Sequence, residues 1–592
     1  MSRKNICIKR IAYLRDIMRK KNIEAFLVTH DDEHLLENIS KNFDRLQWLV
    51  GFTGSAGYLI ITLKNLFLFI DSRYSIQSKL ETKGLKIKIY NVRELDYEKF
   101  ISLKKLKTKN LALDPKTMTK RLFSFYEKLA IKSDIKIIQL KKNLIDYIWI
   151  RNLKVQNTKN IFILNKKYCG ISFNEKLKKL LAFLKKNEIK SIFIQNSESV
   201  AWLFNIRGRD LPYTPITFAY SLISKKYIYI FLEDPILPKK ILNSFKKKIK
   251  FKSFLEIHET LKKLKVSKEN ILIDNNSTSK YYYDLLQKYY KQVFNDIDPI
   301  CHLKSIKNNI EIKNLIKSHV YDGVALTKFI YWFKHIKTGI TELDIVDKID
   351  TLRSQNSGFL TKSFPTIAGS GKNGAIVHYI ANEKTNRKLN SNDLLLLDSG
   401  GQYKLGTTDV TRTLSMGKTE KEQSLNYTLV LKSHIKLNNA VFPKGTSGAF
   451  LDYLTRSELW KRGKDFGHGT GHGVGYCLNV HEGPFSISKN NKISLQEGMV
   501  FSNEPGYYLE GKFGIRIENL VTVKTKVINE KEFLSIETLT LAPYDIDLIK
   551  KKLLTNEELS WIRNYHNDVF KKISPYLNKN EKSWLYKEIN KL

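Results

Sequence analysis

The chain has 592 residues, of which 42% are hydrophobic, so we expect roughly two to four domains and exclude a mostly disordered chain. No apolar run approaches the roughly 18 residues that cross a bilayer, so we expect no membrane partner. The net charge of +42 comes from lysines spread over the whole chain, which indicates a compositional bias with solvated helix faces; without zinc-finger spacing or an RNP-like aromatic pattern, we expect no nucleic-acid partner.

The first predicted element is a helix within the N-terminal 20 residues. Its apolar face is formed by Ile8, Ile11, Leu14 and Met18. The segment lacks the apolar stretch of a secretory signal; a mitochondrial transit peptide is an alternative because it is basic and amphipathic. However, Asp16 interrupts the basic side, and the segment runs straight into an apolar strand at residues 25–29. We therefore expect a structural helix.

Two regions of similar pattern follow. Residues 57–62 and 66–70 read as strands around a short turn, and residues 220–223 and 227–232 read as a second hairpin. GYLIITLKNLFLFID and AYSLISKKYIYIFLED share the order strand, Lys-bearing turn, aromatic strand, acid. This weak internal repeat predicts two copies of one fold.

A third region begins near Lys304. Residues 311–337 have helical spacing, and the tail from Asn556 also reads as helix. Glycine and histidine become denser between residues 358 and 514. We therefore divide the chain into residues 1–150, 151–303 and 304–592.

The cysteines indicate the redox compartment. They are far apart and form no CxxC pair: Cys7, Cys169, Cys301 and Cys477. We therefore expect neither a disulfide framework nor a cysteine-bound zinc, and a reducing, cytoplasmic location.

The first carboxylates with a chemical pattern are Asp398 and Asp409. Asp398 ends the apolar run LLLLDSG, and Asp409 follows eleven residues later in TTDVTRT. By period-2 alternation, Thr407, Asp409 and Thr411 share one face of a second strand. Either aspartate alone could lie in a turn, but a buried carboxylate must be paired or bound to a metal.

Histidines cluster in HGTGHGVGYCLNVHEGP. His468, His472 and His481 lie within fourteen residues, although the whole chain has only 12 histidines. Hydrogen-bonded core histidines are the alternative explanation. His481 and Glu482 do not begin an HExxH zinc motif, because no second histidine follows at the required spacing.

Two glutamates complete the set. Glu504 follows an apolar run in SNEPGYY, and Glu518 follows in GIRIEN, on the same predicted strand face as Arg516. Four carboxylates and one imidazole can hold two divalent cations, because their negative charges offset those of the metals. Oxygen-rich ligands favour Mn²⁺, Mg²⁺ or Co²⁺, and a pair of metals with a bridging hydroxide indicates hydrolysis.

One motif points elsewhere. Residues 369–374, GSGKNG, fit the GxGxxG pattern after a possible strand at residues 364–368. Residues 375–379 read as a strand rather than a helix, so we expect no nucleotide site. The useful residue here is His378, twenty positions before Asp398.

The order and spacing of these residues resemble the pita-bread metallopeptidases, which include methionine aminopeptidase, prolidase and aminopeptidase P. AGSGKNGAIVHY, DSGGQYKLGTTDVTRT, HGTGHGVGYCLNVHEGP and NEPGYYLEGKFGIRIEN are most similar to the long, three-domain form of aminopeptidase P. GFTGSAG, DSRY, AWLFNIRGRD and WIRNYH extend the resemblance over nearly the whole chain. It implies an α/β (α+β) fold with two creatinase-like N-terminal domains before a C-terminal pita-bread catalytic domain.

The resemblance also implies a role for each ligand. Asp398 chelates one metal, Asp409 and Glu518 bridge both, and His472 and Glu504 complete the other. Glu504 also acts as general base on the bridging water. Asn503 departs from many relatives, but it is not a ligand position.

The same resemblance assigns the substrate groups. His378, His468 and His481 bind substrate, and one of them donates to the developing oxyanion or holds the proline carbonyl. Arg516 orients a carboxylate ligand and lies at the substrate; a strand-surface ion pair is the alternative. An Xaa–Pro bond has no N–H to donate, so the proline ring needs an apolar wall, for which we suggest Tyr379 and Tyr507.

The expected function is hydrolysis of the N-terminal Xaa–Pro bond of peptides by a cytoplasmic homodimer whose N-terminal domains narrow the mouth of the site. Two divalent ions per chain are implied, with Mn²⁺ expected and Co²⁺ or Zn²⁺ as alternatives. A prolidase-type dipeptidase and a non-catalytic protein-binding module are the other functions considered. The complete ligand set argues against the binding module.

Overall fold

The computed structural model describes residues 3–92, 106–151, 160–245, 248–336 and 339–592. The chain forms two compact units. One comprises Met1–Ile163, Ile171–Leu211 and Ile216–Ile300, and the other Leu164–Gly170, Pro212–Pro215 and Cys301–Leu592. The boundary expected between residues 150 and 151 lies inside the first unit, so the three-part division stays a prediction.

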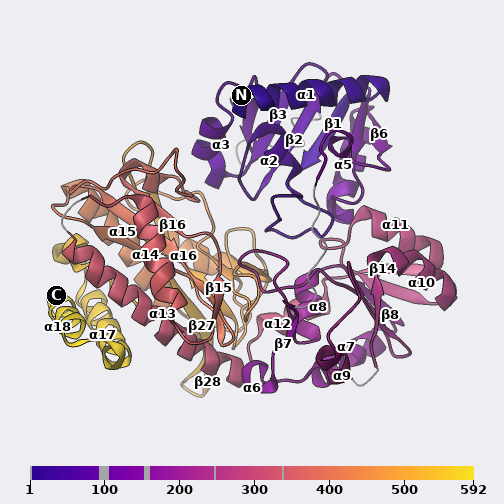
Figure 1. The fold of residues 1–592 in the computed structure, drawn as a ribbon. Helices are drawn as coiled ribbons and strands as arrows, with labels where there is room; N and C mark the ends of the chain where they lie inside the picture. Colours follow the sequence, from indigo (N-terminus) through magenta and orange to yellow (C-terminus); the bar gives the residue numbers. More distant parts are fainter. Residues whose placement is uncertain (1–2, 93–105, 152–159, 246–247, 337–338) are drawn as a thin grey trace. The chain divides into compact units, whose positions relative to one another are not determined.

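The first unit contains two six-stranded sheets with the same topology (Figure 1). The order across the first sheet is β4 (Lys88–Asn91), β3 (Leu66–Ile70), β2 (Gly57–Thr62), β1 (Ala25–Thr29), β5 (Asn110–Leu113) and β6 (Lys136–Gln139). The order across the second sheet is β12 (Lys250–Ser253), β11 (Ile228–Leu232), β10 (Tyr220–Ser224), β8 (Ser191–Ile194), β13 (Asn270–Ile273) and β14 (Gln292–Asn295). Each sheet has two antiparallel pairs at equivalent positions, β1–β2 with β2–β3 and β8–β10 with β10–β11. The predicted duplication is therefore confirmed.

The two copies contact one another reciprocally at the start of equivalent helices. Thr119 and Ser279, the N-cap residues of α5 (Lys120–Lys132) and α11 (Lys280–Tyr289), form an antiparallel bridge. Backbone amides on each side donate to the opposite copy, Lys120 to Thr278 and Lys280 to Met118. Such exchange of equivalent contacts has the two-fold character of an isologous dimer within one chain.

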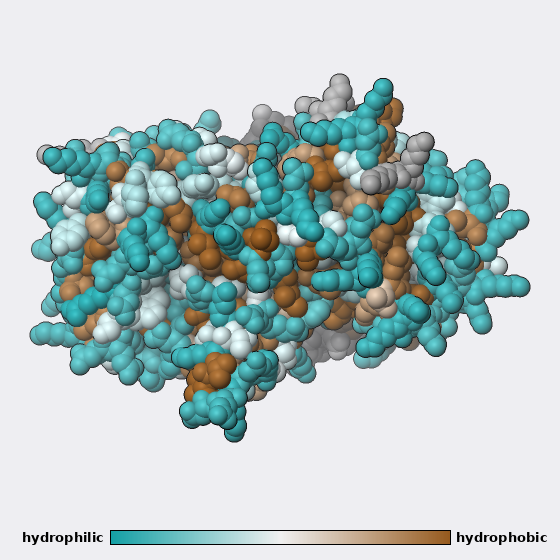
Figure 2. Space-filling view, turned by 90° about the horizontal axis from the view of Figure 1, so that it is seen from below, coloured by the Kyte–Doolittle hydropathy of each residue, from teal (hydrophilic) through white to brown (hydrophobic). Residues whose placement is uncertain are grey.

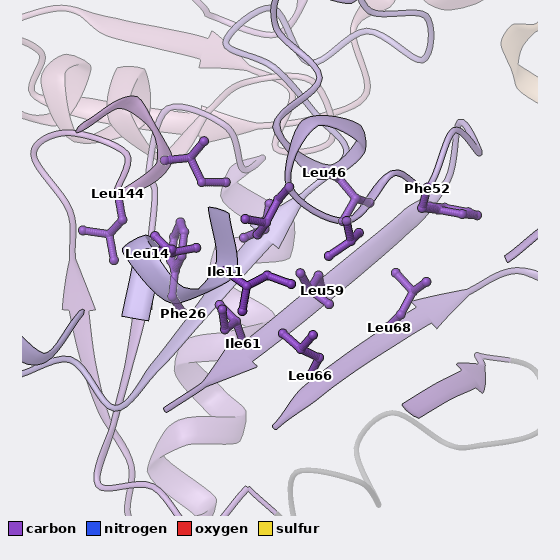
Figure 3. Packing of buried hydrophobic residues seen from close by; sticks show 14 of the residues in the cluster. Ile11, Leu14, Phe26, Leu46, Phe52, Leu59, Ile61, Leu66, Leu68 and Leu144 are labelled. Carbon is purple, nitrogen blue, oxygen red and sulfur yellow. The ribbon is translucent and has the colours of Figure 1, made fainter. Parts of the chain in front are cut away.

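The predicted N-terminal helix is confirmed as α1 (Arg3–Lys20), which covers the first sheet. Its buried residues are Cys7, Ile11, Leu14 and Met18. The assignment of Ile8 to this face is wrong, because Ile8 is 46% exposed and Cys7 takes its place. Figure 3 shows Ile11 and Leu14 packed beside side chains of the sheet.

The remaining elements of the first unit are short. Its other helices are α2 (Arg45–Val50), α3 (Ser75–Glu81), α7 (Phe173–Lys186), α8 (Ser197–Leu203), α9 (Lys239–Ser244) and α10 (Ile257–Leu264). A two-stranded sheet joins β7 (Phe162–Ile163) to β9 (Ile206–Arg207).

The second unit is built on four sheets. The largest has the order β21 (Val441–Pro443), β28 (Lys531–Thr538), β27 (Asn519–Ile528), β24 (Val500–Asn503), β22 (Gly471–Gly473), β23 (Glu482–Ile487). The smaller sheets are β16 (Ile367–Ser370), β17 (Leu394–Ser399) and β20 (Val410–Ser415); β15 (Phe359–Lys362), β18 (Gly401–Tyr403) and β19 (Gly406–Thr407); and β25 (Gly506–Leu509) with β26 (Phe513–Arg516).

The following helices lie wholly or mostly within this unit. They are α6 (Lys166–Cys169), α12 (Pro299–Ser305), α13 (Asn309–His335), α14 (Glu342–Ser354), α15 (Lys421–Asn438), α16 (Gly448–Trp460), α17 (Asn556–Ile573) and α18 (Lys579–Ile589). The long helix predicted at residues 311–337 is confirmed up to His335, and Lys337 lies outside the described residues. The predicted tail helix begins at Asn556, and Figure 1 shows α17 and α18 beside α13.

The strand expected at residues 375–379 is wrong. Residues Gly371–Ala375 form a 3₁₀ helix, η5, and a turn follows. The side-chain amide of Asn373 and the hydroxyl of Tyr379 both donate to the buried carboxylate of Glu342. These bonds to one acceptor turn the segment back on itself, which an extended strand cannot do.

The cysteines, the hydropathy of the helices and the surface bear on the expectations from composition. All four cysteines are free. Over the described residues, no helix is both long and apolar enough to cross a membrane. Figure 2 shows hydrophilic side chains over most of one face, with apolar side chains gathered in smaller areas between them.

Candidate metal centre

Asp398 lies near the end of β17, where it pairs with Thr411 of β20 and Ile367 of β16. Its Oδ2 atom accepts a hydrogen bond of 2.6 Å from Nη2 of Arg516. Its Oδ1 atom is buried and has no hydrogen-bond partner among the described residues. One oxygen is therefore held in place while the other remains available to a cation.

Asp409 lies between β19 and β20, so the continuous strand expected through residues 407–411 is wrong. The chain breaks there because Thr408 bonds back to Gly401, with its amide donating to the Gly401 carbonyl and its hydroxyl accepting from the Gly401 amide. Asp409 is buried, and its Oδ1 atom also has no hydrogen-bond partner within the described part of the chain.

His472 occupies the centre of β22. Its Nδ1 atom is 3.0 Å from the carbonyl oxygen of Gly473, which can only accept, so Nδ1 carries a proton and donates. Nε2 lies 3.5 Å from Oδ2 of Asp409 and 3.5 Å from Oε1 of Glu504. With Nδ1 engaged by the backbone, Nε2 is the ring nitrogen that would coordinate a metal ion beside these two carboxylates.

Close backbone packing sets the position of His472. A Cβ atom on Gly471 would lie 1.7 Å from the carbonyl oxygen of Ser502, so the site requires glycine at this position. The His472 amide donates to the Ser502 hydroxyl, which in turn donates to Oε1 of Glu504. Glu504 directly follows β24.

Glu518 lies in the link between β26 and β27, not on the strand face expected with Arg516. Its amide donates to the Thr411 carbonyl, and the Thr411 hydroxyl donates to its Oε2 atom at 2.8 Å. Ligand atoms of Asp409, His472 and Glu518 all lie within 4.8 Å of one another.

The electrostatics of the site favour a bound cation. Burial, with repulsion from Asp398 and Glu504, raises the pKa of Asp409 well above its usual range. Burial, with repulsion from Asp409, does the same to the pKa of Glu518. Burial also raises the pKa of Glu504. The guanidinium of Arg516 contacts Asp398 and lowers the pKa values of the other three carboxyls, but one guanidinium does not offset four carboxylates. The oxygen-rich donor set, with two unpaired buried oxygens, therefore fits divalent metal ions.

Arg516 is 1% exposed, which excludes the alternative of a surface ion pair. Besides Asp398, its guanidinium donates to the hydroxyls of Thr411 and Tyr508. Because Thr411 also donates to Glu518, Arg516 and Thr411 together connect two of the predicted ligands.

Tyr508 was missed by the sequence analysis. In the β25–β26 hairpin it lies on the same face as Arg516, whereas the suggested Tyr507 lies on the other face and accepts from Lys464. Burial raises the pKa of Tyr508 to about 12, so its hydroxyl stays protonated. The period-2 alternation in GYYL could have identified it, once residue 516 was placed on the opposite strand.

The three substrate histidines lie in different environments. Nδ1 of His468 donates to the Gly469 carbonyl, and its Nε2 accepts from the Tyr508 hydroxyl at 2.8 Å. The ring of His481 packs at 80° against that of His472, with centroids 4.3 Å apart. His378 is half-buried in the turn after η5, next to Val377, whose carbonyl accepts from Arg516. The hydroxyl of Tyr379, the other suggested wall residue, is committed to Glu342.

Comparison with known protein families divides the chain into four segments. Residues 313–525 match metallopeptidase family M24, and residues 532–592 match the C-terminal region of that family. Residues 10–146 and 153–311 each match a creatinase/prolidase N-terminal domain.

Individual relatives match over almost the full length. A probable Xaa-Pro aminopeptidase P from Talaromyces marneffei is 34% identical, covering 99% of this chain and 92% of its own. One from Coprinopsis cinerea is 33% identical, covering 98% and 97%.

Among solved structures, an X-prolyl aminopeptidase from Caenorhabditis elegans, described as a cytosolic enzyme with a di-nuclear active site, matches with a TM-score of 0.94 at 30% identity, covering 99% of this chain and 100% of its own. An Xaa-Pro dipeptidase from Bacillus anthracis matches 63% of this chain, and 99% of its own, with a TM-score of 0.52 at 25% identity.

Proposed function

The chain belongs to the Xaa-Pro aminopeptidase P family of M24 metallopeptidases, and we propose from that premise that it releases the N-terminal residue of peptides whose second residue is proline. The observation that carries this proposal is the convergence of Nε2 of His472 with the carboxylates of Asp409 and Glu504, in a site with unpaired carboxylate oxygens. This donor set is that of a divalent metal site.

Five residues would hold two divalent ions: Asp398, Asp409, His472, Glu504 and Glu518. When bound, the ions supply Lewis-acid polarisation of the scissile carbonyl and lower the pKa of water. Glu504 is the general base in this assignment. Its support is position, since Oε1 is oriented by the Ser502 hydroxyl and lies 3.5 Å from the His472 ring.

Proton and hydrogen-bond roles fall to the three histidines. In its neutral form, His468 has Nδ1 and Nε2 both engaged, by Gly469 and Tyr508, so its ring is fixed by the protein. His481 lies directly beside the metal ligand His472, which suits contact with a substrate carbonyl. His378 is the remaining candidate, and Arg516 holds Asp398 rather than contacting substrate in the free protein.

The proposal also includes the identity of the metal, the cellular location and the oligomeric state. Oxygen-rich ligands support Mn²⁺, with Co²⁺ or Zn²⁺ as alternatives. A cytosolic location is supported by the description of the Caenorhabditis elegans enzyme and by the free cysteines. A homodimer is supported by the family resemblance.

A dipeptidase is the second candidate. The matching dipeptidase covers 63% of this chain, whereas the aminopeptidase covers 99%. The duplicated N-terminal region therefore favours the aminopeptidase.

Hydrolysis of Arg-Pro-Pro and of an Xaa-Pro dipeptide tests these alternatives, with chelator-treated protein reloaded with Mn²⁺, Co²⁺ or Zn²⁺. We expect metal-dependent release of arginine from the tripeptide, lost in Asp409→Ala. Preference for the dipeptide would make the protein a prolidase. No hydrolysis by folded protein under any of these metals would exclude the enzyme.

A further inference from the structure

A buried ion cluster lies next to the histidines of the candidate metal centre. Lys304, Lys307 and Glu482 are each 3% exposed. Nζ of Lys304 lies 2.8 Å from Oε2 of Glu482, and Nζ of Lys307 lies 2.6 Å from Oε1. Lys307 donates a hydrogen bond to Oε1 and Lys304 forms an ion pair with Oε2, so each oxygen of one carboxylate contacts an ammonium group from the same short segment. We call these three residues the lysine clamp.

Glu482 connects the clamp to His481. It directly follows His481 and begins β23, where it pairs with Gly473 of β22, the neighbour of His472. A Cβ atom on Gly473 would lie 2.2 Å from the Glu482 carbonyl oxygen, so the two backbones are in close contact. A displacement of Glu482 would therefore move the His481 ring against the His472 ring.

The two lysines are fixed to a different strand. Ile306, between them, forms a bridge with Met499, and the Lys307 amide donates to the Gly498 carbonyl. Met499 directly precedes β24, which leads to Glu504. The clamp therefore joins the edge strand β23, which directly follows His481, to the start of β24, which directly precedes Glu504.

We propose that Lys304 and Lys307 are positioning residues that set the orientation of His481 through Glu482. The inference rests on the proposed role of His481 at the substrate. Burying three charges is costly, and apolar residues of similar volume often stabilise a core equally well. The charged residues have an advantage over apolar ones because ion pairs are directional. Two ammonium groups fix both oxygens of the Glu482 carboxylate, whereas an apolar contact would allow the end of the strand to rotate.

A double-mutant cycle tests the proposal. The neutral variant Lys304→Met/Lys307→Met/Glu482→Met removes all three charges together. We expect kcat/KM for Arg-Pro-Pro to fall about 10- to 100-fold, mainly through kcat, with two metals still bound per chain. Combined with His481→Ala, the neutral variant should cause no further fall. Effects that multiply would show that the clamp does not act through His481 and would overturn the proposal.

The matched control is Lys432→Met/Glu558→Met, which removes an ion pair of 2.6 Å between α15 and α17. It should leave kcat/KM unchanged. Glu482→Asp keeps every charge but shortens the anchor by one methylene, so it tests the same orientation if the triple variant does not fold. We expect a similar fall in kcat.

A readout without catalysis separates this proposal from the proposed function. The imidazole proton resonance of His481, assigned by its loss in His481→Ala, should move in Glu482→Asp and stay in place in the Lys432 control. An unmoved resonance would overturn the positioning role, whether or not Arg-Pro-Pro is cleaved. Absence of hydrolysis in the unaltered protein, together with a moved resonance, would overturn only the proposed substrate.

Discussion

Two clusters of buried charge in the second unit differ in how they are balanced. The candidate metal centre has four carboxylates and one guanidinium, with Oδ1 of both Asp398 and Asp409 lacking hydrogen-bond partners among the described residues. In the lysine clamp, each oxygen of Glu482 lies within 2.8 Å of an ammonium group. The carboxylates of the first cluster outnumber its guanidinium, so this cluster requires additional positive charge, whereas the second has one more ammonium group than carboxylates and requires no further cation.

Burial shifts the pKa of a group in each cluster toward the neutral form, but the neighbouring charges act in opposite directions. In the metal centre, burial and like charges raise the pKa of Asp409, since the carboxylate has too few cations around it. In the clamp, burial lowers the pKa of Lys307, although attraction to Glu482 opposes this. A ligand site is thus recognised by the sign and amount of charge that the protein leaves uncompensated, and not by the presence of buried charge alone.

Removing a ligand should give the largest effect. We expect Asp409→Asn to lower kcat/KM on the order of 10³-fold or more, because the metals lose a shared ligand. In metal-free protein the same change should raise Tm, since it removes a carboxylate from a repulsive cluster. Enzyme assays, metal analysis and thermal unfolding with chelator measure these outcomes.

The exposed Asp568→Asn on α17 is the control and should change neither quantity. A lower Tm for metal-free Asp409→Asn would show that the carboxylate is compensated by the protein itself. The contrast with the lysine clamp would then disappear.

The clamp should show the opposite behaviour toward charge removal. Glu482→Ala removes the carboxylate that two buried ammonium groups share and should destabilise the second unit by about 3–5 kcal/mol. The neutral triple variant should cost far less, because no charge remains unpaired. Denaturant unfolding of both variants checks this, and equal losses would contradict a balanced cluster.

Several of these elements could be predicted because their signals are local. The strands at residues 25–29, 57–62 and 66–70 have the predicted bounds, as apolar runs with turn residues between them. The proposed carboxylate ligands lie near the ends of apolar runs, where a carboxylate is buried and must be paired or bound to a metal. The lysine clamp could not be found this way, because Lys307 and Glu482 are 175 positions apart and neither has a distinctive neighbour.

Other errors came from polar bonds that override local pattern. Residues 375–379, AIVHY, read as a strand, but Asn373 and Tyr379 bond to Glu342 and turn the segment. Tyr507 was chosen over Tyr508 because sequence alone does not say which face of the β25–β26 hairpin meets Arg516. Such choices depend on the register between strands, which is fixed only in the folded chain.

Replacing Arg516 should have a smaller effect on metal binding than removing a ligand, because Arg516 acts only by orienting Asp398. Arg516→Met should weaken metal binding about 10-fold, because Asp398 loses the group that orients it; the loss of a positive charge acts in the opposite direction and keeps this effect small. Arg516→Lys should recover part of the loss, since an ammonium group can still donate to Asp398 but cannot bond to Asp398, Thr411 and Tyr508 together. Competition with a metal indicator measures both affinities. Equal affinity of Arg516→Met and unaltered protein would assign Arg516 a structural role only.

Replacing a buried neutral histidine away from the metal centre should give the smallest effect. Here burial is accommodated by keeping the side chain uncharged, and not by a metal or by an ion pair. His566, on α17, accepts from the Tyr544 amide through Nε2, and burial lowers its pKa to about 3. Because this lies below the usual value of about 6.5, the unfolded state binds more protons between these two values. Its contribution to stability is therefore complete above pH 6.5 and is lost as pH falls toward 3.

His566→Gln keeps an acceptor but cannot be protonated, so it should reduce the loss of stability by about 1 kcal/mol between pH 6 and pH 5. Chemical unfolding of the two proteins at these pH values measures the difference. An unchanged pH dependence would mean that the ring becomes charged in the folded state, with a counter-charge that balances it as Glu482 balances the lysines.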